Sequence, residues 1–258
     1  MRRTRRSSGS TARSASRRFP SRRVACSSCR ASIGGVNEAR YDGLADWYDT
    51  EFQPAPLESE TWHTLVDLLG EGSGALVDVG CGTGNYAAGL AERGWTVTGV
   101  DQSEDMLRRA RAKGIPAARS EATALPFDDA SFDAAVSTFT HTDVDDFAGL
   151  LREVVRVLRP GAPFVYIGVH PCFVGPHSVY DVDRHVPELQ PGWYRLTGRY
   201  TKAPGISRSS GLRMQVGASH LPLGLFLQAF LDAGLRLERV EEPPEREYSF
   251  GLAFRWRR

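Results

Sequence analysis

One glycine-rich stretch constrains the fold of this chain more than any other feature. Residues 76–85 read LVDVGCGTGN, so that an apolar run interrupted by one aspartate leads into Gly80, Gly82 and Gly84. Such a run indicates a buried parallel strand that ends in a tight turn. Glycine permits backbone conformations closed to other residues, and a helix after the turn directs free N–H groups at a ligand. The stretch therefore predicts an α/β fold with a nucleotide site at the turn.

The spacing of the glycines separates two kinds of nucleotide site. A dinucleotide fingerprint reads G-x-G-x-x-G, and its third glycine lets helix and strand pack closely. Here the third glycine, Gly84, comes one position earlier and is followed by Asn85. The spacing disfavours an NAD-dependent dehydrogenase. A purely structural turn between strand and helix also explains the glycines, so downstream residues must decide.

A second strand, predicted at residues 95–100, ends on an acid that supports a nucleoside ligand. The run WTVTGV is followed directly by Asp101. A carboxylate at the end of this strand can accept hydrogen bonds from both hydroxyls of a ribose. Ser103 comes next and can cap the following helix.

The segment DVGCGTG at 78–84 resembles motif I of the class I methyltransferases that depend on S-adenosyl-L-methionine (SAM). Three further segments match family blocks in the same order: EATALPF at 121–127, SFD at 131–133 and RVLRPG at 156–161. The resemblance runs from Tyr41 to the C-terminus. It implies a Rossmann-like, mostly parallel sheet of seven strands with an antiparallel hairpin at one edge, helices on both faces, and SAM as the cofactor.

The resemblance also assigns residues to the cofactor. The glycine turn would border the methionine portion of SAM, Asp78 would anchor the turn, and Asp101 would hold the ribose. Glu121 and Ala122 would contact the adenine, and the tyrosines of segment 41–49 would lie over the pocket as part of a lid. The predicted cofactor-binding set is Tyr41, Tyr48, Asp78, Gly80, Cys81, Gly82, Gly84, Asp101, Gln102, Met106, Glu121, Ala122 and Thr138.

Histidines are the candidates for a catalytic base. A methyl group on a sulfonium is displaced in line, so the protein mainly has to hold the acceptor about 3 Å from it and exclude water. Where the acceptor must lose a proton, histidine is the usual base because its pKa lies near working pH. The predicted candidates are, in order, His141, His170 and His177. Any one such histidine is more often a hydrogen-bonded structural residue or a helix cap than a catalyst.

The rest of the pattern is an alternation of strands and helices, which predicts a parallel sheet. Further strands are predicted at 115–119, 132–138, 163–169, 235–241 and 248–255, and helices at 57–69, 86–93, 103–113, 143–158 and 221–233, with Asp143 as the cap of the fourth helix. Residues 170–221 break the alternation. Because this long segment is rich in aromatic residues, we expect an ordered cap that binds the acceptor.

Charge divides the chain into a basic tail and an acidic body. The net charge is +1, yet residues 1–37 carry ten arginines and no acid, which leaves −9 on residues 38–258. We predict a disordered tail at 1–37 and a single methyltransferase domain at 38–258 that includes the cap. An organellar transit peptide, a basic arm for nucleic acid or anionic lipid, and upstream sequence from a mistaken start site all fit the tail.

Charge and composition limit the kinds of partner that this chain is expected to bind. The negative body disfavours a polyanionic substrate, so we expect a small-molecule acceptor rather than nucleic acid. The four cysteines are too scattered for a disulfide framework and indicate a reducing cytoplasm. No apolar run reaches the roughly 18 residues of a membrane helix, and Cys26 and Cys29 lack the second pair that a zinc site needs. Neither a membrane partner nor a metal is predicted.

The leading hypothesis is transfer of the SAM methyl group to an O, N or C atom of a small molecule. One alternative is a SAM-binding protein of the same fold that catalyses a cyclisation or rearrangement without methyl transfer. Another is a binding module that uses the arginine-rich tail to bind nucleic acid.

Overall fold

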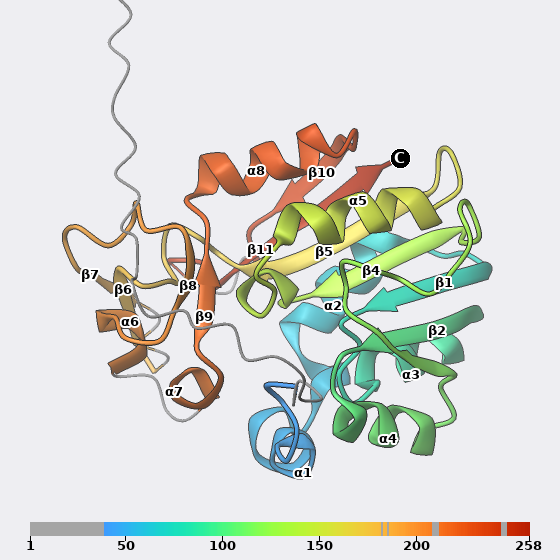
Figure 1. Ribbon diagram of the computed structural model, residues 1–258, viewed down its shortest axis with the longest axis horizontal. Coiled ribbons are helices and arrows are strands. Elements are labelled where there is room, and N and C mark those ends of the chain that lie inside the picture. The colour runs from blue at the N-terminus through green and yellow to red at the C-terminus, as the bar shows by residue number, and fades with distance from the viewer. Residues whose placement is uncertain (1–38, 182, 185, 208–211, 244–246) are drawn as a thin grey trace, which may run out of the picture. The chain divides into compact units, whose positions relative to one another are not determined.

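The computed structural model describes residues 39–181, 183–184, 186–207, 212–243 and 247–258 of the chain (Figure 1). The predictions for the tail at 1–37, and for Cys26 and Cys29 within it, lie outside these residues.

A seven-stranded sheet forms the core of the described body. Its strands stand in the order β10-β11-β5-β4-β1-β2-β3. Their bounds are β1 Gly74–Val79, β2 Trp95–Asp101, β3 Ala117–Arg119, β4 Ala134–Thr138, β5 Pro163–Val169, β10 Arg236–Glu241 and β11 Gly251–Arg257. Neighbouring strands from β3 to β5 pair in parallel, whereas β11 runs antiparallel to both β5 and β10. The predicted fold class, a mostly parallel sheet with an antiparallel hairpin at one edge, is confirmed.

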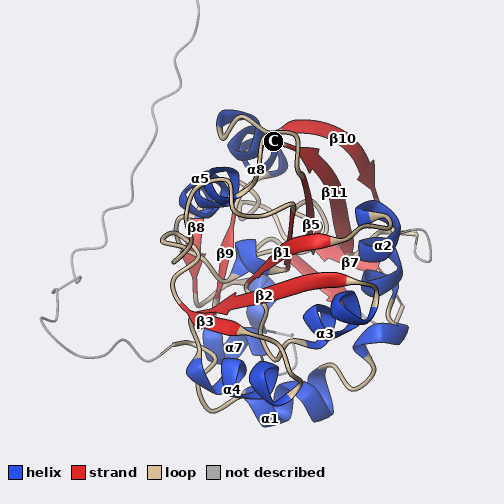
Figure 2. Cartoon of the chain, turned by 90° about the vertical axis from the view of Figure 1, so that its right-hand side faces the viewer, coloured by secondary structure: helices blue, strands red, loops and turns tan. Residues whose placement is uncertain are grey.

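Helices cover both faces of this sheet (Figure 2). The helices are α2 Glu60–Leu69, α3 Asn85–Glu92, α4 Glu104–Ala112, α5 Phe147–Val157 and α8 Leu223–Asp232. Val77 and Val79 of β1 pack in one cluster with α5 and α8, and Leu76 packs in the other cluster with α2 and α3. Successive strand residues point to opposite faces, so a strand covered on both sides reads as a continuous apolar run. Among the described residues, no helix has the length and apolar character needed to cross a membrane.

The helix predicted to start at Asp143 begins later. A 3-10 turn at Thr140–Thr142 follows β4, and α5 starts after Asp146. The Asp146 carboxylate accepts a hydrogen bond from the backbone N–H of Gly149 at 2.8 Å, so Asp146 is the N-cap. The prediction of Asp143 as the cap is therefore wrong. The run DVDD offers several candidate caps, and only the path of the chain decides among them.

Residues 170–221 fold into short paired elements. The strands are β6 Ser178–Asp181, β7 Val186–Leu189, β8 Gly198–Tyr200 and β9 Ala218–His220, and the helices are α6 Pro204–Ser207 and α7 Leu212–Val216. β6 pairs with β7 and β8 with β9, both antiparallel. Figure 1 shows these elements gathered on one side of the main sheet. Strands this short leave too few residues for a sequence period to appear, which is why no regular structure was predicted here.

Candidate functional site

The turn between β1 and α3 requires its glycines. Gly80, Gly82 and Gly84 have φ angles of 76°, 52° and 77°, which other residues rarely adopt. A Cβ on Gly80 would collide with the Thr140 side chain, and one on Gly84 would lie 2.8 Å from the Cβ of Ala110 in α4. Gly84 therefore allows α3 and α4 to approach closely.

Asp101, at the end of β2, points toward this turn. Its Oδ2 accepts a hydrogen bond from the backbone N–H of Gly82 at 2.9 Å, and its Oδ1 accepts one from the N–H of Ser103 at 2.9 Å. Burial raises the pKa of this carboxyl, and the two backbone bonds oppose that effect. The bonds fix the orientation of the carboxylate while leaving half of its lone pairs available.

A cavity of about 620 Å³ lies beside the turn and brings together most of the predicted cofactor residues. Those that line it are Gly80, Gly82, Asp101, Gln102 and Met106 from the turn, β2 and α4, and Tyr41, Tyr48, Ala122 and Thr138 from elsewhere in the chain. Segments far apart in the sequence thus converge on one space next to the glycines. Within the described part of the chain, no group of histidine, cysteine and acidic side chains is arranged to hold a metal ion.

Four members of the predicted set lie outside the cavity lining. Gly84 packs against α4, as described above. Cys81 is 9% exposed, and its sulfur lies 2.6 Å from the position that a Cβ on Gly99 would take. Glu121 is exposed, and its carboxylate accepts a bond from Gln102 Nε2 at 3.4 Å. Asp78 is 2% exposed, and burial, followed by the charge of Asp101, raises its pKa to about 7.

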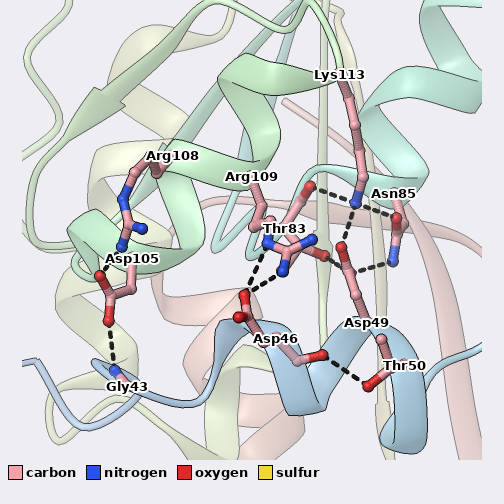
Figure 3. Close-up of polar contacts among 10 residues, drawn as sticks. All are labelled: Gly43, Asp46, Asp49, Thr50, Thr83, Asn85, Asp105, Arg108, Arg109 and Lys113. Carbon is pink, nitrogen blue, oxygen red and sulfur yellow. Dashed lines mark hydrogen bonds and ion pairs between the residues drawn. The ribbon is translucent and has the colours of Figure 1, made fainter.

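The segment 41–52 is tied to the glycine turn by polar contacts (Figure 3). The Asp49 carboxylate accepts bonds from the Thr83 hydroxyl, from Asn85 Nδ2 at 3.2 Å and from Lys113 Nζ at 2.8 Å. Burial raises the pKa of Asp49, but the bonds from Lys113 and Thr83 outweigh it and the net shift is downward. The segment predicted to be a lid is therefore fastened to the turn and to α4 on the side that carries Asp49.

Asp143 joins the same segment to the cap. Its Oδ1 accepts bonds from the Tyr41 hydroxyl at 3.0 Å and from Arg213 Nη1 of α7 at 2.6 Å. Arg213 also donates to the Thr142 hydroxyl at 2.7 Å, and both Asp143 and Arg213 line the cavity. Burial alone would lower the pKa of Arg213, but the charge of Asp143, its hydrogen bond and the nearby tyrosines Tyr41 and Tyr200 together outweigh burial, and the pKa rises. The sequence does not reveal this pair, because Asp143 precedes a predicted helix as a candidate cap and Arg213 lies in a segment without a regular pattern.

Of the three histidines predicted as bases, only His141 lines the cavity. Its Nδ1 lies 2.7 Å from the Tyr166 hydroxyl, which also accepts the backbone N–H of His141 at 3.0 Å. Burial, followed by the positive charge of Arg213, lowers the pKa of His141 to about 3. His170 Nε2 lies 2.8 Å from Glu242 Oε1, and His177 Nε2 lies 2.9 Å from a backbone carbonyl. At neutral pH, a ring with a pKa near 3 is uncharged and weakly basic.

Comparison with known proteins shows that part of the chain is similar to methyltransferases. Residues 77–166 match a family model described as a methyltransferase domain. The demethylmenaquinone methyltransferase of Renibacterium salmoninarum is 34% identical over 148 residues, which cover 55% of this chain and 62% of that protein. A ubiquinone/menaquinone biosynthesis C-methyltransferase of Desulfotalea psychrophila is 33% identical over 150 residues, covering 54% and 61%. The chain thus spans about three fifths of the length of these curated relatives.

A solved structure extends the likeness over more of the chain. The SAM-dependent methyltransferase of Mesorhizobium loti is 29% identical, with a TM-score of 0.64, and the match covers 78% of this chain and 98% of that one. The predicted resemblance is confirmed: residues 77–166 match the methyltransferase-domain family, and the chain is similar over most of its length to a SAM-dependent methyltransferase.

Proposed function

We propose that this chain transfers the methyl group of SAM to a small-molecule acceptor. The observation that carries the proposal is the cavity itself, which the glycine turn and Asp101 border on one side and the cap borders on the other. Two molecules that react by in-line displacement need such a shared, enclosed space. Neither the −9 charge of residues 38–258 nor the enclosure favours a polyanionic substrate.

For the cofactor, we propose the arrangement predicted from the sequence, with two adjustments. Gly80 and Gly82 border the methionine portion, and the free lone pairs of Asp101 accept the two ribose hydroxyls. Gln102 and Met106 flank the adenine. Gly84 acts through packing against α4 rather than through contact with SAM. Asp78, which lies behind the cavity lining, supplies a buried carboxyl beside the turn whose ionised form would attract the ammonium group of the methionine portion.

SAM supplies the electrophilic methyl group, and the residues of this chain position the acceptor and exclude water. Segment 41–52 and the cap enclose the cavity. Asp143 joins the two, because it accepts hydrogen bonds from Tyr41 of the segment and from Arg213 of the cap. Because the pKa of His141 is lowered to about 3, we assign it a positioning role with Tyr166 and not proton abstraction. This arrangement suits an acceptor that is nucleophilic without a strong protein base.

Quinone-related compounds are the first acceptor class to test. The curated relatives are named for demethylmenaquinone and for C-methylation in ubiquinone and menaquinone biosynthesis. A sulfonium methyl is an electrophile, so the nucleophile would be the electron-rich hydroquinone form of such a ring. The cavity lining includes apolar side chains from the sheet and the cap, among them Ile167, Val174 and Phe250.

Calorimetry and isotope transfer test the proposal separately. Titration of the full chain with SAM should give saturable binding. SAM labelled in its methyl group should then give a labelled product with a hydroquinone acceptor. Absence of SAM binding at any accessible concentration would overturn the proposal. Binding and acceptor turnover without label in the product would instead favour the cyclisation or rearrangement alternative.

A further inference from the structure

Two buried histidines lie together on the cap side of the cavity. His177 precedes β6 and His220 ends β9; the two residues are 3% and 2% exposed, and their ring centroids are 5.4 Å apart. His177 Nε2 lies 2.9 Å from the carbonyl oxygen of Cys172, and His220 Nε2 lies 3.1 Å from that of Tyr194. A carbonyl oxygen only accepts hydrogen bonds, so in both rings the Nε2 atom carries the hydrogen.

The other nitrogen of each ring therefore has a free lone pair. Burial lowers the pKa of both histidines, that of His220 to about 4, so both rings are neutral near pH 7. A neutral imidazole with its hydrogen on Nε2 is a hydrogen-bond acceptor at Nδ1. The Nδ1 of His177 is buried and has no hydrogen-bond partner among the described residues. Buried polar atoms are rarely left in this state, because an unmade bond is costly.

Gly175 lies beside both rings. A Cβ built on Gly175 would lie 3.0 Å from His220 Nδ1 and 3.1 and 3.2 Å from Cε1 and Nδ1 of His177. Because Gly175 has no side chain, this space between the two rings stays open. Gly175, His220 and Ser219 line the cavity, and the buried hydroxyl of Ser219 also has no partner within the described residues. This wall of the cavity thus carries several buried atoms that can accept hydrogen bonds, next to a glycine, which has no side chain to fill the space.

We propose that His177 and His220 form a subsite that binds a hydroxyl or amino group of the methyl acceptor through their Nδ1 atoms. Two acceptor nitrogens beside the same small space attract a group with hydrogens to donate and repel carbonyl, ether and carboxylate oxygens. The subsite therefore selects acceptors that carry a donor group in addition to the atom to be methylated. The inference rests on the proposed methyl transfer, because it names the chemistry of that acceptor.

Small aromatic probes can test the subsite without turnover. The full chain, labelled with 15N at its histidines, is titrated with phenol, which has a donor, and with fluorobenzene, which has a similar shape and none. We expect phenol to shift the Nδ1 resonances of His177 and His220 at lower concentration than fluorobenzene. Equal binding of the two probes, or no response of either Nδ1 to phenol, would overturn the proposal.

Two substitutions separate recognition from structure. His220→Gln keeps a donor for the Tyr194 carbonyl but removes the Nδ1 acceptor, and we expect it to weaken phenol binding about tenfold. Gly175→Ala places a methyl group between the two nitrogens and should abolish the preference for phenol even if His220→Gln fails to fold. His63→Gln, at an exposed histidine of α2, is the matched control and should leave binding unchanged.

SAM binding distinguishes failure of the subsite from failure of the proposed function. All three variants should bind SAM as the wild type does, because none of the substituted residues belongs to the proposed SAM site. Normal SAM binding with an unchanged preference for phenol in both subsite variants would reject the subsite alone. If the wild type does not bind SAM, the proposed methyltransferase function is itself rejected.

Discussion

The two sides of the cavity are built in different ways. On the cofactor side, the contacts come from backbone groups of one turn and from Asp101, which two backbone N–H groups hold in place. On the cap side, they come from buried side chains on short elements, such as Arg213 of α7 and His220 of β9. Backbone geometry follows from the turn itself, whereas a side-chain cluster depends on distant residues that meet only in the fold. Under the proposed function, the first side binds SAM and the second binds the acceptor.

The largest effect should follow the loss of the Asp101 carboxylate. Asp101→Asn replaces one acceptor oxygen with a donor, so one ribose hydroxyl loses its charge-assisted bond and faces an N–H group. Because bonds to charged groups contribute about 1.5–3 kcal/mol each, we expect SAM affinity to fall roughly 100-fold in calorimetry. Asp128→Asn, at an exposed aspartate between β3 and β4, is the control and should bind normally. A small loss of SAM affinity in Asp101→Asn would show that this carboxylate does not hold the ribose.

The cofactor side could be predicted because its residues follow one another along the chain. Gly80 to Gly84 directly follow β1, and Asp101 ends β2, the next strand along the chain. In this pattern, the residue type itself indicates a backbone or ligand role. The cap side could not be predicted in this way. Arg213 meets Asp143 from 70 residues away, and the lone pair of His177 becomes significant only once His220 packs beside it. Contacts between distant side chains leave no local pattern.

The next effect concerns the stability of the turn. Gly84→Ala combines a positive φ with a Cβ only 2.8 Å from that of Ala110. We expect the free energy of unfolding to fall by about 2–4 kcal/mol in urea denaturation, from backbone strain and overpacking together. Gly114→Ala shares a positive φ of 83° but has nothing within 4 Å, so it should lose only about 1 kcal/mol. Equal losses of stability in the two variants would show that the close packing of Gly84 against α4 does not contribute.

Asp78 should make SAM binding depend on pH. Its pKa is raised to about 7, and the ammonium group of SAM favours the ionised carboxyl, so affinity should rise as pH increases through 7. We expect binding at pH 6 to be about tenfold weaker than at pH 8. Asp78→Asn should flatten this dependence, and an unchanged slope in that variant would place the titrating group elsewhere.

The same raised pKa affects stability without SAM, with the opposite sign. The folded protein holds the Asp78 proton more tightly than the unfolded chain, whose pKa is near 3.8. Stability of the cofactor-free protein should therefore decrease as pH rises from about 4 to about 7. Asp78→Asn should reduce that decrease in urea denaturation across this range.

The smallest effect should come from His141, on the acceptor side. A ring with a pKa near 3 is a poor base, so His141→Asn should lower kcat by less than about tenfold, compared with 100-fold or more for loss of a general base. The wild-type pH profile of kcat should show no inflection that the variant lacks. A 100-fold loss accompanied by a missing inflection would restore the base predicted from the sequence.

The most direct test of the account is a structure of the full chain with SAM bound. We expect the methionine portion beside Gly80 and Gly82, and both ribose hydroxyls within hydrogen-bond distance of the Asp101 carboxylate. SAM bound elsewhere, or a ribose that contacts neither oxygen of Asp101, would contradict it.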